Sequence, residues 1–215
     1  MIYDNLGTCY KNQDFYDKAL EVYKDAYYIY KQYNSKNILY PLRGMASIYA
    51  IQEQFEKALK YYQTALTIAS STNDSTWQSI LFCDISRIYD NKNLYEAAYS
   101  YIVRSIQYAP RSSDLSAMYF WKGEILHNLN QLDSAFYYIN LAKKSSDLNT
   151  QASAYQALYE IKKEQGELND AILYNDTSPI LYDSIQDLNH SAEISHILKQ
   201  HATETLQQAE VIRSE

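Results

Sequence analysis

The feature that most constrains the fold is an alanine that recurs every 36 to 40 residues along the chain. Each copy lies in a similar short segment, such as FYDKALEVY at 15–23 and QFEKALKYY at 54–62. The five aligned positions are Ala19, Ala58, Ala98, Ala135 and Ala171. Self-similarity at a nearly constant period of this length predicts an array of stacked repeats, each of which is one supersecondary unit.

Small and large side chains alternate around each alanine at helical spacing. The position seven residues later is always small, and a large apolar residue lies three residues earlier. The small set is Ala26, Ala65, Ser105, Ala142 and Ser178, and the large set is Tyr16, Phe55, Tyr95, Leu132 and Leu168. These spacings place the groups on one helical face. The small residues predict that two helices approach closely there, because the distance between helix axes depends on the side chains at the contact.

The first copy, YDNLGTCY followed by KALEVY, resembles the tetratricopeptide repeat. The resemblance covers residues 1–178 in five copies, with a mean period of 38 residues that is longer than the family's period of about 34. The fifth copy departs from the pattern at Tyr159, Lys162 and Asn175, which suits an end cap. The resemblance implies an all-α, right-handed superhelical solenoid of antiparallel helix pairs.

Ten helices are expected, two for each repeat. Connectors rich in Ser, Asn and Asp supply the groups that accept hydrogen bonds from the first N–H groups of a helix. The expected helices span 2–12, 16–33, 38–52, 55–71, 76–91, 94–109, 114–129, 132–146, 150–165 and 168–178. We expect these five hairpins to form one domain, residues 1–178, followed by a C-terminal helix within residues 179–215.

Residues 179–215 carry an apolar stripe that includes Leu181, Ile185 and Leu188. The stripe predicts an amphipathic helix, which either caps the last hairpin or begins a coiled-coil connector. The LYDSI segment at 181–185 resembles the tail of bacterial tetratricopeptide sensor proteins, in which the array often precedes a membrane helix and a signalling or DNA-binding domain. The opening residues follow the helical pattern with no cap before them, so we expect the chain to be part of a longer protein.

Composition and motifs argue against several functional classes. The net charge of -7 disfavours nucleic-acid binding, which needs a surface rich in Lys and Arg. No apolar run is long enough to span a membrane, and no signal peptide opens the sequence. Both a periplasmic and a cytoplasmic location therefore stay possible for the protein. The sequence carries no Gly-rich phosphate loop, no metalloprotease motif and no signature of a Ser-His-Asp site. We therefore expect no catalysis, no cofactor and no metal ion.

The family resemblance assigns groove-facing positions to the first helix of each repeat. The expected partner-binding residues are Tyr40, Arg43, Ser47, Arg87, Asp90, Asn91, Phe120, Glu124, His127, Asn128 and Gln156, and Asp4, Thr8, Lys11, Cys83, Glu160 and Lys163 share their register. Arg43 and Arg87 can bind a carboxylate through two hydrogen bonds each. Tyr40 and Phe120 can pack against apolar side chains of a peptide. A further set is interpreted as core or half-buried packing groups: Tyr61, Tyr62, Tyr101, Tyr137, Tyr138 and Tyr174.

The leading functional hypothesis is a non-catalytic protein–protein interaction scaffold. It binds a peptide or a partner protein in its concave groove, within a bacterial regulatory or signal-transduction protein. The alternative is a structural module that forms a homodimer through its C-terminal helix. Neither hypothesis involves contact of this region with nucleic acid or with a membrane.

Overall fold

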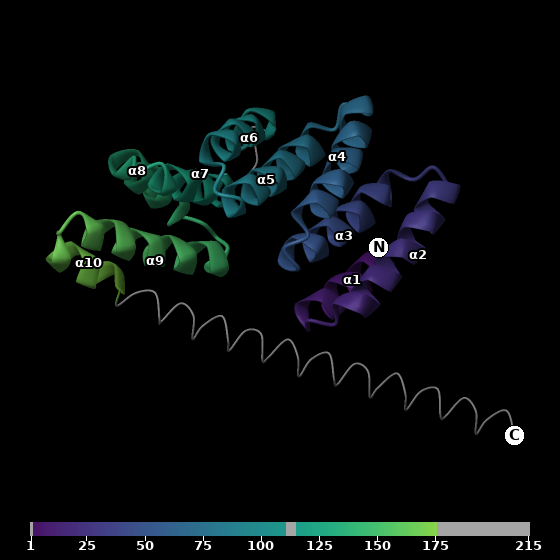
Figure 1. Ribbon diagram of the computed structural model, residues 1–215, viewed down its shortest axis with the longest axis horizontal. Coiled ribbons are helices and arrows are strands. Elements are labelled where there is room, and N and C mark those ends of the chain that lie inside the picture. Colours follow the sequence, from purple (N-terminus) through teal and green to yellow (C-terminus); the bar gives the residue numbers. More distant parts are fainter. Residues whose placement is uncertain (1, 111–114, 176–215) are drawn as a thin grey trace, which may run out of the picture. The chain divides into compact units, whose positions relative to one another are not determined.

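The computed structural model describes residues 2–110 and 115–175, and within them the chain is all helical, without strands (Figure 1). The α-helices are α1 (Ile2–Asn12), α2 (Tyr16–Gln32), α3 (Leu39–Ile51), α4 (Phe55–Ser71), α5 (Ser75–Asn91), α6 (Tyr95–Tyr108), α7 (Ser116–Asn128), α8 (Leu132–Ala142), α9 (Leu148–Glu164) and α10 (Leu168–Asn175), and a 3-10 turn (Lys36–Ile38) precedes α3. The predicted all-α architecture is confirmed, with ten α-helices in the described residues.

The helix bounds agree with the predicted ones to within a few residues, and the largest difference has a local cause. Helix α8 ends at Ala142, four residues earlier than expected. The Ser-Ser-Asp stretch that follows belongs to the cap of α9, because the Asp147 carboxylate accepts a hydrogen bond from the Thr150 backbone N–H at 2.8 Å. The predicted C-terminal helix in 179–215, and with it the dimer hypothesis, lies outside the described residues.

Each hairpin turns at one residue in the left-handed region, five positions before the repeated alanine. These residues are Asp14, Glu53, Asn93, Asn130 and Gly166, with φ between 58° and 79°. In the second repeat the Gln54 N–H donates to the Tyr49 carbonyl at 2.8 Å, and the Glu53 N–H donates to the Ala50 carbonyl at 3.0 Å. This is the Schellman pattern, which satisfies the last carbonyls of a helix and reverses the chain.

The repeated small residues lie where helices meet, as the sequence predicts. All five alanines of the repeat are at most 2 % exposed, and Ala26, Ala65, Ser105 and Ala142 are 0 % exposed. A Cβ atom added at Gly7 of α1 would lie 2.5 Å from the ring of Tyr23 on α2. Ser105 also joins α6 to α5, because its hydroxyl donates to the Ser79 carbonyl at 2.8 Å and the Ser79 hydroxyl donates to the Ser105 carbonyl at 2.7 Å.

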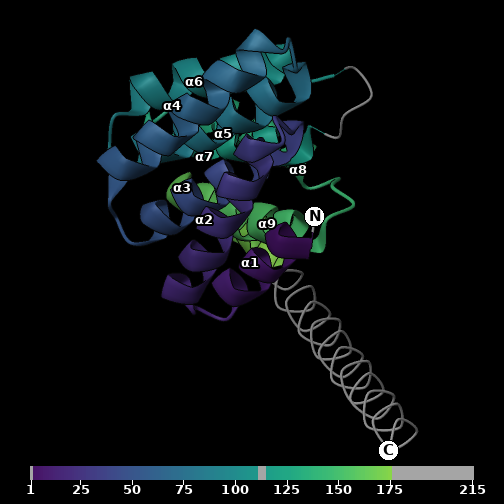
Figure 2. The same ribbon diagram turned by 90° about the vertical axis from the view of Figure 1, so that its right-hand side faces the viewer.

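The described residues fall into two compact units, divided between Tyr138 and Ile139 within α8. In the first unit, α1, α3, α5 and α7 approach one another in turn, each neighbouring the next (Figures 1 and 2). No such approach joins α2, α4 and α6 to one another in the described part of this unit. In the second unit α9 and α10 pack together as a helical hairpin.

Candidate functional site

A continuous hollow lies over α1, α3 and α5. It consists of two adjoining cavities of about 220 and 200 Å³, which share the lining residues Lys11, Ser47, Tyr62, Asp84 and Arg87. The first cavity is also lined by Asp4, Thr8, Tyr23, Tyr40, Arg43 and Gly44, and the second by Ala50, Ile51, Ile88 and Asn91. We call this hollow the α1/α3/α5 groove.

Arg43 of α3 is held by Asp84 of α5. Its Nε donates to Asp84 Oδ2 at 2.5 Å and its Nη2 donates to Asp84 Oδ1 at 3.2 Å, which is the bidentate geometry of the strongest ion pairs. The Asp84 side chain is 6 % exposed and the Arg43 side chain 45 % exposed. The carboxylate raises the pKa of Arg43 further above its ordinary value. The guanidinium fork that was expected to hold a ligand carboxylate is therefore filled by a residue of the chain itself.

The other two cations of the groove are placed differently. The Arg87 guanidinium lies 4.3 Å from the centre of the Trp121 ring, a cation–π contact that joins α5 to α7. Lys11 has no ion pair within the described residues. Burial, followed by the charge of Arg43, lowers its pKa; the charge of Asp84 opposes this effect and that of Arg87 adds to it. A negative group placed beside Lys11 would offset the repulsion by the two arginines.

Acidic side chains gather between α5 and α7, beside the groove. The Asn128 side chain donates to Asp90 Oδ1 at 2.9 Å, and so links the two helices. Burial raises the pKa of Asp90. Burial also raises the pKa of Glu124, an effect that His127 opposes and Asp90 strengthens. These four residues therefore form one cluster, which would attract a positive group of a ligand.

Both aromatic side chains that were expected to contact a ligand pack against a tryptophan of the chain. Tyr40 is 47 % exposed and meets Trp77 edge-on, with ring centres 4.8 Å apart. Phe120 meets its neighbour Trp121 edge-on, with ring centres 5.1 Å apart. Gln156 belongs to the second compact unit, where its amide donates to Glu160 at 3.3 Å.

The structure thus separates the predicted residues into three groups. Tyr40, Arg43, Ser47, Arg87 and Asn91 line the groove. Asp90, Glu124, His127 and Asn128 form the acidic cluster, with Phe120 on the same helix α7. Gln156 belongs to the second compact unit and to neither of these groups.

Sequence reasoning missed three side chains that shape the groove. Tyr23 and Tyr62 come from the second helices α2 and α4, and their rings reach the groove although they are only 2 % and 3 % exposed. Burial, followed by the charge of Asp84, raises the pKa of Tyr62 well above its ordinary range. Asp84 was passed over because the repeat register selected its neighbour Cys83, whose thiol has a pKa raised to about 12 by burial.

Among residues 2–110 and 115–175, no three His, Cys, Asp or Glu side chains are grouped so as to hold a metal ion. In the same part of the chain, every helix is too short or too polar to cross a lipid bilayer.

Comparison with known families gave one match. The sequence model described as the tetratricopeptide repeat matches residues 1–69 and 37–110. Comparison with curated protein sequences gave no match.

Several solved structures are similar in fold at low sequence identity. BtubC (BKLC) from P. vanneervenii has a TM-score of 0.69 at 15% identity, covering 84% of this chain and 78% of that one. A putative kinesin light chain from Podosopora anserina with TPR-like repeats has a TM-score of 0.63 at 12% identity, covering 86% and 95%. MamA from Desulfovibrio magneticus RS-1 has a TM-score of 0.59 at 14% identity, covering 85% and 94%.

Proposed function

Because the chain belongs to the tetratricopeptide-repeat family, we propose that its α1/α3/α5 groove binds an extended segment of a partner protein. Families built from this repeat are generally non-catalytic scaffolds that bind proteins or peptides. The proposal assigns the same role to this chain and names the groove as the binding surface.

The observation that carries the proposal is the continuity of the groove across three successive first helices. Its two cavities share five lining residues, so a single extended segment can contact α1, α3 and α5 together. Hydroxyl, amide and ammonium groups are available along it from Ser47, Asn91 and Lys11. Such polar groups fix the position of an extended peptide, while half-buried aromatic rings contact its apolar side chains.

Charge further defines the segment. Lys11 favours an acidic group at one place in the groove, and the cluster of Asp90 and Glu124 favours a basic group near the α5–α7 boundary. Arg43 contributes little net attraction, because Asp84 balances its charge. A segment with an acidic residue and a basic residue is therefore the best complement.

The proposal is tested by selecting binders from a library of random 12-residue peptides displayed on phage. A bulky side chain at Ser47 should obstruct both cavities, since Ser47 lines each of them. Ser100 of α6 is the matched control, because it is exposed and its hydroxyl also donates to the carbonyl three residues earlier. We expect selected peptides to bind the wild type and Ser100→Trp equally, and Ser47→Trp at least tenfold more weakly.

The selection has two outcomes that contradict the proposal. Peptides that bind Ser47→Trp as tightly as the wild type would place the binding surface elsewhere. Failure to enrich any peptide above the level given by an unrelated folded protein would refute peptide binding in the groove. Circular dichroism of both variants checks that the helices are intact.

The proposal extends to the setting in which the scaffold works. The resemblance of residues 181–185 to the tails of bacterial tetratricopeptide sensor proteins supports a role within a regulatory or signal-transduction protein. Binding of a segment in the groove would then be the event that such a protein senses.

A further inference from the structure

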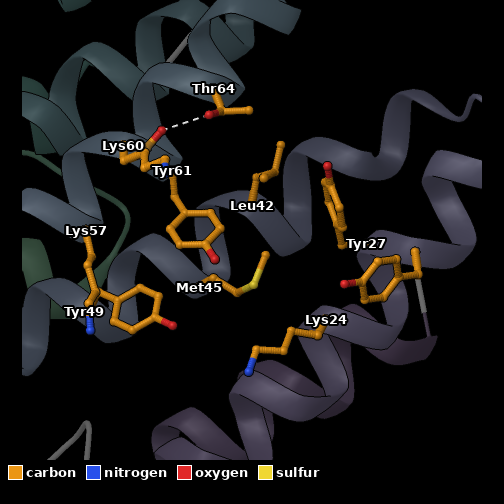
Figure 3. A pocket seen from close by; sticks show the side chains of 10 residues that line it. Lys24, Tyr27, Leu42, Met45, Tyr49, Lys57, Lys60, Tyr61 and Thr64 are labelled. Atoms are coloured by element: carbon orange, nitrogen blue, oxygen red, sulfur yellow. Dashed lines mark hydrogen bonds between the residues drawn. The ribbon is translucent and has the colours of Figure 1, made fainter.

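A second pocket opens between α2 and α4, and none of its lining residues lines the groove. Its volume is about 520 Å³, and α3 forms its floor through Leu42 and Met45, which are each 2 % exposed. The pocket exists because α2 and α4 do not approach one another within this part of the chain. Figure 3 shows Tyr49 and Tyr61 on one side of the pocket and Tyr27 on the other, with Met45 between them.

The walls are aromatic and the rim is basic. The rings of Tyr49 and Tyr61 stack with centres 5.5 Å apart, and Lys57 Nζ lies 5.5 Å from the Tyr49 ring centre. The rim carries two further lysines, Lys24 of α2 and Lys60 of α4. We call these lysines, tyrosines and floor residues, together with Tyr28 and Thr64, the Lys/Tyr pocket.

The charge of this pocket is opposite to that of the chain. Three of its ten lining residues are lysines and none is acidic, although the chain has a net charge of -7. Lys24 and Lys60 have no ion pair within the described residues, and Lys57 donates to the neutral Gln54 side chain at 2.7 Å besides lying over the Tyr49 ring. Within the described residues these lysines therefore have no carboxylate at ion-pair distance, and their ammonium groups can pair with a ligand.

The Lys/Tyr pocket points to a second binding site, and we propose that it receives an acidic segment of a partner protein that carries one large apolar side chain. The apolar side chain enters between the tyrosine rings and contacts Met45, and the flanking carboxylates pair with the lysines of the rim. An apolar centre surrounded by a polar rim is the anatomy of a protein–protein interface. A site for a small anion would instead place its charged groups in the depth of the pocket, where they are shielded from water.

This site is independent of the proposed groove. The pocket lies between second helices, and none of its lining residues lines the groove. The scaffold would then hold two segments at once, or two parts of one partner.

The site is tested with synthetic nine-residue peptides, followed by NMR chemical-shift mapping and fluorescence anisotropy. The probe has a central Phe with four Glu or Asp residues around it. One comparison peptide replaces the acids by Gln and Asn, a second replaces Phe by Ala, and phenylacetate serves as the small anion. We expect the probe to shift the signals of Lys24, Lys60 and Tyr61, and each comparison peptide to bind at least fivefold more weakly.

Charge reversal on the protein provides the decisive variant. Lys24→Glu with Lys60→Glu should weaken binding of the probe about tenfold, because two exposed ion pairs are lost and replaced by repulsion. The control is Lys36→Glu with Lys144→Glu, which has the same net charge and alters two exposed lysines outside the pocket. The control should bind the probe within twofold of the wild type. Raising the salt concentration from 50 to 300 mM should weaken binding to the wild type, since it screens exposed charges.

Several results would overturn the inference. Equal loss of affinity in the two double variants would show that only the overall charge matters. Chemical shifts confined to Ser47, Arg87 and their neighbours would assign acidic segments to the groove and leave the pocket without a ligand. Saturation of the pocket by phenylacetate at the concentrations needed for the peptide would assign it to small anions. Absence of any shift at millimolar peptide would refute the site.

Discussion

Replacing Arg43 by Met should destabilise the first unit through the carboxylate that it leaves behind. Met retains most of the apolar stem of the arginine side chain but cannot donate to Asp84. The Asp84 side chain is only 6 % exposed, so water replaces the lost donors poorly. Breaking such a buried pair on one side typically costs about 3–5 kcal/mol. We expect a value near the lower end, about 3 kcal/mol, because Asp84 borders the groove and one side of it is open to solvent.

The reverse substitution should cost less. Asp84→Asn leaves Arg43 without its charged partner, but the Arg43 side chain is 45 % exposed and water can solvate it. We expect a cost of about 1 kcal/mol, the size of one ordinary hydrogen bond. The double variant should cost about 2 kcal/mol, so the cycle gives a coupling free energy of about 2 kcal/mol between the two residues.

Urea unfolding followed by tryptophan fluorescence measures all three variants. The chain has two tryptophans, Trp77 and Trp121, and both belong to the unit that contains the ion pair. If Arg43→Met and Asp84→Asn cost the same and their effects add, the carboxylate is solvated and the pair does not hold α3 to α5. That result would refute the reasoning.

Three further perturbations test other parts of the account. Glu53→Gly should raise the free energy of unfolding by about 1 kcal/mol, because φ is 58° at this turn and only glycine adopts it without strain; urea unfolding that shows no gain contradicts the strain. Gly44→Ala should lower the free energy of unfolding by about 1–3 kcal/mol despite the better helix propensity of alanine, because the added methyl group overlaps the Tyr23 ring; Tyr23→Leu in the same chain should recover part of the loss. Burial and the hydrogen bond to Asp4, 2.6 Å long, raise the pKa of Tyr30 to about 12. The folded chain favours the neutral phenol, so Tyr30 contributes to the free energy of unfolding below its unfolded pKa of about 10, and this contribution is lost as the pH rises towards 12. Tyr30→Phe should therefore lessen the decline in the free energy of unfolding between pH 9 and 11.5. An unchanged decline would exclude the effect.

The helices and their contacts were predictable because they depend on short spacings within the sequence. Ala58 and Ala65 lie seven residues apart on α4, so a helical period alone places both on the buried face, where they are 0 % exposed. The same reasoning assigned Tyr137 to the wrong side of its helix. It was predicted to be half-buried, but it is 60 % exposed. It lies two residues after Ala135, a rotation of about 200° around the helix axis, so it points away from the buried face.

The hairpin turns show a second limit. Gly166 is the kind of residue that marks a turn in a sequence, but the four equivalent turns use Asp14, Glu53, Asn93 and Asn130, which carry no such obvious signal. Their position became recognisable only when the turn was seen to lie five residues before the repeated alanine. A non-glycine residue is tolerated in this conformation where the rest of the hairpin stabilises the turn.

The candidate sites were only partly predictable, because their chemistry depends on pairs of residues far apart in the sequence. The register placed Arg43 and Arg87 towards the groove, where both are found. It could not reveal that Asp84, 41 residues after Arg43, fills the guanidinium fork. The Lys/Tyr pocket was missed for the same reason, since Lys24 and Lys60 come to it from α2 and α4, whose backbones do not approach each other.

The most direct test of the central claim is photo-crosslinking of a selected peptide to the groove. A p-benzoylphenylalanine at Asn91 replaces an exposed side chain that lines the second cavity, whereas the same group at Ser100 lies outside both cavities. We expect a peptide from the display selection to form an adduct with the Asn91 protein and not with the Ser100 protein. An adduct of equal yield at both positions, or at Ser100 alone, would contradict the claim that the α1/α3/α5 groove is the binding surface.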